Sequence, residues 1–407
     1  MNRRVVLMLS LVAILASGAG LQAKEKPSDG TAPEKTTLNL KSKFTFIDRS
    51  KIVNRGTIRY TVPKKRNDGI EVADARLHGN VTPIVRLLNK IEKQNQDFKV
   101  GKGSKARKNR YPYNPKIRGC VDSVLIAENG KLIVEEYFAD ASVDKPHYQM
   151  SITKSIVAYA IGKAIELGKI KSENDLILDY LPEVDRSKVA KGVDTLTLKD
   201  LLTMNSGIRF KAARKKTPIT LKNHAQLYLT QTEPIPARKI YKYDGTNVDL
   251  LCHILHNTTG MTLTQCAKRH LFGPMGITNF RFGKSACGLD KGAAGMRLTS
   301  RDMLKVALMT MHGGKWNGEQ ILSKEWIEKA TAVHVNKDRP TKYGYLWWSQ
   351  NATVNGNTYR VRSCRGAGGQ FIFMIPELDI AAIFTSYYAT NIPIQYFEKI
   401  ILPSFVK

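Results

Sequence analysis

The chain has 407 residues, 42% of them hydrophobic, and its 64 Lys and Arg against 35 Asp and Glu give a net charge of +29. This length and composition exclude a disordered chain and allow one large domain or two of ordinary size. The charge favours an anionic partner, such as an acidic cell-envelope polymer, over nucleic acid, for which no recognition motif is present.

The cysteines and histidines give no sign of a metal or cofactor. The five cysteines lack paired spacing, so the sequence predicts neither a disulfide framework nor a zinc pattern. The eight histidines show no His-x-x-x-His spacing on a predicted helix. We therefore expect no metal and no cofactor.

The first residues are typical of an export signal. Asn2-Arg3-Arg4 precede an apolar run over 5–16, and small residues follow as far as Ala23. Residues 1–23 are therefore predicted to be a secretory signal peptide, with an uncleaved anchor as the alternative. No later apolar stretch is long enough to cross a membrane, so we expect a periplasmic or secreted protein.

Residues 24–118 are predicted to be a basic N-terminal extension and lead-in. Most of 24–62 is polar and lacks periodicity, whereas 81–91 has the pattern of a short amphipathic helix. The basic run over 99–110 contains no acidic residue, and we interpret it as a solvated surface loop. Residues 121–138 then read as a β-hairpin that turns at Asn129-Gly130.

A buried helix follows the hairpin. Apolar residues recur at steps of 3, 4 and 1 from Ile152 to Ile165, and Gly168 is a natural end. Ser151 stands at the N-terminal edge and Lys154 lies three residues on, on the same face. A lysine desolvated against the apolar stripe can act as a base toward such a hydroxyl. This is the Ser-x-x-Lys arrangement of acyl-transfer enzymes.

The same spacing is weak as a pattern, and a structural alternative stays open. It also occurs at Ser142/Lys145 and Ser404/Lys407, although neither pair opens a long helix. Ser151 could be a simple helix cap, with Lys154 on a solvated face.

The remaining elements predict an α+β fold. The pattern is mostly helical over about 171–290, and strands are predicted at 359–362, 370–375 and 380–385. The hairpin and these C-terminal strands would form one antiparallel sheet flanked by helices, with a helical subdomain inserted between them.

Five segments in order resemble the serine β-lactamase and penicillin-binding-protein-like hydrolases. The most similar branch is class C, with its esterase and 6-aminohexanoate-dimer hydrolase relatives. The resemblance covers 119–407 and implies a β-lactamase/transpeptidase-like fold. The segments are Asn129–Tyr137, Met150–Ser155, Leu198–Gly207, Tyr243–Leu251 and Gly366–Gln370.

The resemblance implies a role for each matching residue. Ser151 would be the nucleophile, Lys154 its proton acceptor, and Tyr243 the relay of that proton to the leaving group. The backbone N–H groups of Ser151 and Ala367 would stabilise the oxyanion, and Gly366 would let the strand approach the substrate. The other expected substrate-binding residues are Gly245, Asn247, Gln370 and Trp347. Of the two neighbouring tryptophans, Trp347 and Trp348, we expect one to line the pocket and the other to cap the sheet.

Two departures shape the expected substrate. Gly245 stands where the family has Asn or Ser, so one polar partner of Lys154 is missing unless Asn247 or a water replaces it. Cys364 stands where β-lactam-recognising branches begin their third motif with Lys or His. The cation that grips a substrate carboxylate is therefore missing, unless Arg362 or Arg365 substitutes for it. We therefore expect an exported serine hydrolase that cleaves a small-molecule ester or amide. The alternatives are a β-lactamase or DD-peptidase, and a catalytically idle envelope-binding homologue.

Overall fold

The computed structural model describes residues 55–96, 120–210, 219–336, 341–387 and 391–406. The predicted signal peptide, most of the basic extension and the basic run over 99–110 lie outside the described residues. No helix within the described ranges has the length and hydrophobicity needed to cross a membrane.

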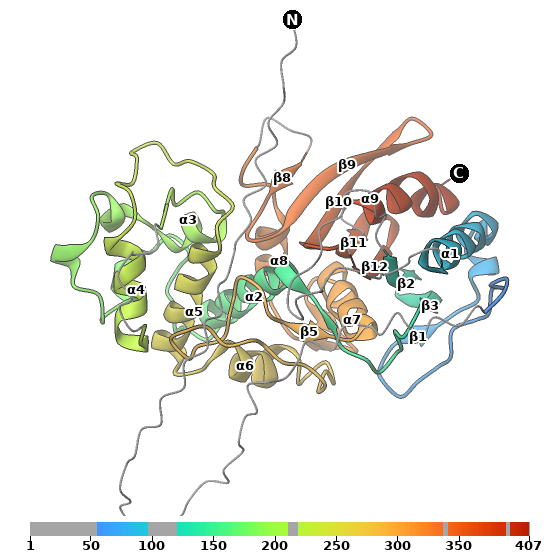
Figure 1. The fold of residues 1–407 in the computed structure, drawn as a ribbon, viewed down its shortest axis with the longest axis horizontal. Helices are drawn as coiled ribbons and strands as arrows, with labels where there is room; N and C mark the ends of the chain where they lie inside the picture. Colours follow the sequence, from blue (N-terminus) through green and yellow to red (C-terminus); the bar gives the residue numbers. More distant parts are fainter. Residues whose placement is uncertain (1–54, 97–119, 211–218, 337–340, 388–390, 407) are drawn as a thin grey trace, which may run out of the picture. The chain divides into compact units, whose positions relative to one another are not determined.

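The described residues contain a sheet of eight strands in the order β1-β3-β2-β12-β11-β10-β9-β8 (Figure 1). All neighbouring strands are antiparallel except β1 and β3. The N-terminal hairpin joins the C-terminal strands through β2 and β12, where Leu125 pairs with Ile383. The predicted single sheet is confirmed. The strands are β1 Glu71–Val72, β2 Cys120–Glu128, β3 Lys131–Tyr137, β8 Lys342–Tyr343, β9 Trp348–Val354, β10 Asn357–Gly366, β11 Gln370–Ile375 and β12 Ile380–Tyr387.

The hairpin turns where the sequence predicts. Asn129 has φ of 50° and Gly130 has φ of 72°. Two successive residues in the left-handed region form the turn whose twist matches antiparallel strands, and Asn-Gly is the pair that adopts it most readily. The turn therefore fixes the register of β2 against β3.

Helices cover both faces of the sheet. On one face, alternate strand residues such as Leu125 and Ile372 share a core with α2 and α7. On the other face, Ile126 and Phe373 pack against α1 and the C-terminal helices. Strand residues point alternately to opposite faces, so successive apolar residues serve two cores. The helices are α1 Val81–Gln96, α2 Thr153–Glu166, α7 Ser300–Met311, α8 Lys324–Thr331 and α9 Ile392–Tyr396.

Between α2 and β5, the named elements are all helical, as predicted for about 171–290. They occupy the green to yellow part of the chain, beside the sheet (Figure 1). Thr197 begins α3 with a capping box, in which its side chain and that of Asp200 each bond the other's backbone N–H. The helices are α3 Leu198–Leu202, α4 Leu221–Thr230, α5 Gly245–Thr259 and α6 Leu263–Cys266. The short strand pairs are β4 His147–Tyr148 with β5 Arg297–Leu298, and β6 Lys315–Trp316 with β7 Glu319–Gln320.

Candidate active site

Ser151 lies in a tight turn immediately before α2. The turn is a 3-10 helix over Met150–Ile152, and Met150 has φ of 49°, a conformation that a residue with a side chain rarely adopts. The Thr153 hydroxyl donates to the Met150 carbonyl at 2.6 Å and so helps to hold it. The N-cap of α2 is Ile152, which excludes the alternative that Ser151 is a simple cap of this helix.

Lys154 is buried beside Ser151. Its side chain begins on the first turn of α2, the residue is only 4% exposed, and Nζ lies 3.0 Å from the Ser151 Oγ. Nζ also donates to the backbone carbonyl of Ala293. The alternative of a lysine on a solvated face is therefore wrong.

Tyr243 completes the group from the segment before α5. The Lys154 Nζ lies over its ring, 5.0 Å from the centroid, which is a cation–π contact. The ring also packs against Trp348, with centroids 5.5 Å apart, and Tyr243 is 38% exposed. The three predicted catalytic side chains are thus brought together at a place that solvent reaches, while their chemical roles stay predictions.

The glycine-rich turn between β10 and β11 lies against the Ser151 turn. A Cβ on Gly366 would collide with the backbone carbonyl of Gln149, two residues before Ser151. Ala367 is exposed at the start of the turn, and Gly368 and Gly369 have φ of 85° and 97°. Only a residue without a side chain allows this approach, which explains the glycine at position 366.

Asn247 does not replace the missing partner of Lys154. It is buried, its Oδ1 accepts from the Ser206 hydroxyl at 2.5 Å, and its Nδ2 donates to the Asp244 carbonyl at 3.2 Å. The Ala293 carbonyl supplies the hydrogen bond instead. Sequence reasoning missed this residue because a backbone acceptor leaves no signal in residue type.

Two further residues that were expected to bind substrate, Gln370 and Trp347, are buried in the core. Gln370 is buried and binds the Ser386 backbone, with its Nε2 donating to the carbonyl and its Oε1 accepting from the N–H at 3.1 Å. Trp347 is 1% exposed and packs against Tyr159. We correct this assignment to Trp348, the neighbour that contacts Tyr243.

Cys364 supplies no cation, and of the two arginines named as substitutes, Arg362 has a buried Nε without a hydrogen-bond partner among the described residues, whereas Arg365 is partly engaged. Cys364 is buried in β10, and burial raises the pKa of its thiol, so it is neutral at physiological pH. Arg365 donates from Nε to the Ser363 hydroxyl at 3.0 Å and from Nη2 to Gln350, and its guanidinium lies over the Trp348 ring. This arginine borders the site through Trp348, and two of its three nitrogens already have hydrogen-bond partners.

His147 is a hydrogen-bonded neighbour, as predicted. Its Nε2 lies 3.0 Å from a carboxylate oxygen of Asp122, and its Nδ1 lies 3.1 Å from the Tyr148 carbonyl. Both ring nitrogens of His147 therefore have hydrogen-bond partners.

Comparison with known proteins identifies the family and the fold. Over 290 residues the chain is 22% identical to 6-aminohexanoate-dimer hydrolase of Paenarthrobacter ureafaciens, covering 64% of this chain and 71% of that protein. Two solved structures share the fold. The octameric penicillin-binding protein homologue from Pyrococcus abyssi has a TM-score of 0.57 and 19% identity, and covers 69% of this chain and 72% of its own. EstCE1, a hydrolase with promiscuous acyltransferase activity, has a TM-score of 0.58 and 16% identity. The match covers 79% of this chain and 98% of the EstCE1 chain. The Beta-lactamase family model matches residues 114–393, and the chain therefore belongs to this family of serine hydrolases.

Proposed function

We propose that the protein hydrolyses an ester or small amide through an acyl-enzyme on Ser151. The observation that carries the proposal is the buried Lys154, whose Nζ lies 3.0 Å from the Ser151 Oγ. Acyl transfer requires the hydroxyl to lose its proton as it attacks, and this amine is the acceptor within reach.

The reaction balances with groups already in the site. The Ser151 Oγ bonds to the substrate carbonyl carbon, and its proton passes to Lys154 and then, through the Tyr243 hydroxyl, to the departing alcohol or amine. Water then cleaves the acyl-serine ester, which releases the acid and restores the hydroxyl. The N–H groups of Ser151 and Ala367 would stabilise the oxyanion, and one such donor contributes roughly 10²- to 10³-fold in rate.

The substrate class follows from what the site lacks. Cys364 is neutral and cannot grip a substrate carboxylate at the third motif, and Arg365 already binds Ser363 and Gln350. This argues for a neutral ester or small amide over β-lactams and D-Ala-D-Ala peptides. The names of two relatives, an aminohexanoate-dimer hydrolase and a hydrolase with acyltransferase activity, support the same choice.

A catalytically idle binding protein is the weaker alternative. It rests on Gly245, Cys364 and the basic charge, and against the first of these Lys154 keeps a backbone acceptor in Ala293. The proposal also includes export, on the pattern over residues 1–23, and contact with an anionic envelope polymer, on the net charge of +29. Cell fractionation and the N-terminus of the mature protein test export, and salt-sensitive retention on the polymer tests binding.

A fluorophosphonate probe tests the catalytic assignment. Wild type should be labelled and Ser151→Ala should not, whereas Ser142→Ala should stay labelled because it alters an equivalent Ser-x-x-Lys spacing elsewhere. Equal labelling of wild type and Ser151→Ala would refute the proposal. An ester, amide and cephalosporin panel then separates the substrate classes, and rapid turnover of the cephalosporin alone would favour a β-lactamase.

A further inference from the structure

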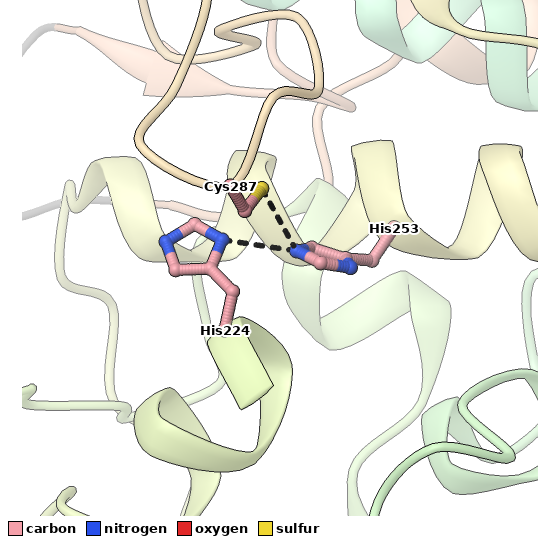
Figure 2. Close-up of side chains that lie close together, drawn as sticks. All are labelled: His224, His253 and Cys287. Atoms are coloured by element: carbon pink, nitrogen blue, oxygen red, sulfur yellow. Dashed lines mark hydrogen bonds between the residues drawn. The ribbon is translucent and has the colours of Figure 1, made fainter. Parts of the chain in front are cut away.

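Three side chains from distant parts of the chain converge beside α5. His224 lies on α4, His253 on α5, and Cys287 on the loop that precedes β5 (Figure 2). The His224 Nδ1 lies 3.0 Å from the His253 Nε2, and the Cys287 Sγ lies 3.8 Å from the same nitrogen. All three potential ligand atoms lie within 4.8 Å of one another.

These separations match a tetrahedral metal site. Zinc at its usual bond lengths would hold two nitrogens about 3.4 Å apart, and a nitrogen and a sulfur about 3.6 Å apart. The observed distances of 3.0 and 3.8 Å differ from these by a few tenths of an ångström. Two imidazole nitrogens and a thiolate also form the donor set that suits zinc, whereas calcium and magnesium prefer oxygen.

We propose that His224, His253 and Cys287 bind one zinc ion, with water as the fourth ligand. Both histidines are buried, and Cys287 is half-buried, so water can reach the remaining position. The proposal concerns a site away from the hydrolase chemistry and does not depend on the proposed function.

The other nitrogen of His253 supports this assignment. Its Nδ1 lies 3.6 Å from the Glu183 Oε1, and both buried atoms lack a hydrogen-bond partner among the described residues. Histidines that bind a metal commonly donate their second N–H to a carboxylate, which fixes the ring and the tautomer. A small shift of either side chain would complete that bond when the Nε2 binds the ion.

The Cys287 thiol also has a polar neighbour besides the two histidines. The Ser285 Oγ lies 3.1 Å from the Cys287 Sγ. Thiolate is the ligand form of cysteine.

Two of the three segments that the site would join also build the candidate active site. Helix α5 begins at Gly245, two residues after Tyr243, and the Cys287 loop continues to Ala293, the acceptor for Lys154. A metal bound to α4, α5 and this loop would therefore hold the segments of Tyr243 and Ala293 in place beside Lys154. We infer a structural role for the ion.

Metal titration of the whole protein tests the proposal. After dialysis against a chelator, the protein should bind one zinc per chain, and its midpoint of thermal unfolding should rise with zinc concentration. Cobalt(II) in place of zinc should give a thiolate-to-cobalt charge-transfer band and the intense visible bands of tetrahedral coordination. Cys287→Ser should remove the charge-transfer band, whereas Cys266→Ala, at a buried cysteine in α6, should keep it.

Several outcomes would overturn the proposal. Wild type that retains no zinc, or cobalt bands without thiolate charge transfer, would exclude the site whether or not any variant folds. Zinc binding that survives both Cys287→Ser and His253→Gln would place the ion elsewhere.

Discussion

Replacing Gly245 by alanine should weaken both the fold and turnover. The backbone of Gly245 lies outside the left-handed region, so alanine fits the conformation, but its Cβ would lie 2.9 Å from the Cβ of Ala293. Carbon atoms in contact prefer about 3.5–4.0 Å. The segment at Ala293 must therefore move, and its carbonyl is the acceptor for Lys154.

The size of the effect follows from two opposed contributions. Replacing glycine by alanine in a helix gains about 0.5–1 kcal/mol. Overpacking by one methyl group costs about 1–3 kcal/mol, so we expect a net loss of about 1 kcal/mol in the free energy of unfolding. Displacing a catalytic group by up to about 1 Å can cost about 10²-fold, so kcat/KM should fall by roughly 10- to 100-fold.

Urea unfolding and ester turnover measure these two effects, and a second substitution isolates their cause. Adding Ala293→Gly removes the opposing methyl group and should restore most of the kcat/KM lost in Gly245→Ala. Gly283→Ala is the matched control on the same loop, because its Cβ would meet nothing closer than 3.7 Å. Unchanged turnover in Gly245→Ala, or no recovery in the double variant, would refute the reasoning.

Three further substitutions test other parts of the structure. Tyr243→Phe keeps the ring contacts, so the free energy of unfolding should change by less than about 0.5 kcal/mol. Turnover should fall by about 10²- to 10⁴-fold if the phenol relays the proton. An unchanged kcat would exclude the relay. Arg301→Met should lose about 3 kcal/mol in urea unfolding, because it removes the buried cation that pairs with two partly buried carboxylates, those of Asp68 and Glu135. The exposed Arg186→Met should lose less than about 1 kcal/mol, and similar losses would contradict the argument. Burial raises the pKa of the Asp302 carboxyl in the folded protein above the ordinary value of 3.8. The protonated carboxyl therefore favours the folded state fully below pH 3.8, and this contribution to stability is lost as pH rises through the pKa of the folded protein. Asp302→Asn should therefore be more stable than wild type at pH 7, with the difference disappearing toward pH 3, and a difference independent of pH would show that ionisation is not its cause.

The elements that the sequence predicts well are those specified by neighbouring residues. Asn129-Gly130 forces a hairpin, and Gly168, with φ of 65°, follows the end of α2. Helix α1 is longer than predicted because polar residues continue it: Asn95 is buried, and its Nδ2 donates to the Val121 carbonyl at 2.7 Å. The apolar pattern of the sequence therefore ends before Asn95, although its hydrogen bond to Val121 in the sheet keeps this polar residue in the core.

The parts of the site that depend on distant segments could not be predicted in the same way. His224, His253 and Cys287 are separated by 29 and 34 residues, so no spacing within one helix connects them. Similarly, Trp347 and Trp348 are equally apolar in sequence. Only the packing of Tyr159 against Trp347 decides which one is buried and which one contacts Tyr243.

The two departures from the family pattern differ in what the fold can replace. At Gly245 the lost group is a hydrogen-bond acceptor, and any backbone carbonyl that reaches the same place can serve, as that of Ala293 does. At Cys364 the lost group is a positive charge, which no backbone atom supplies, and Arg365 already binds Ser363 and Gln350. Under the proposed function, the first departure leaves the activation of Ser151 intact, while the second would change which substrates the site can hold. A changed substrate is thus a better explanation of this sequence than a lost activity.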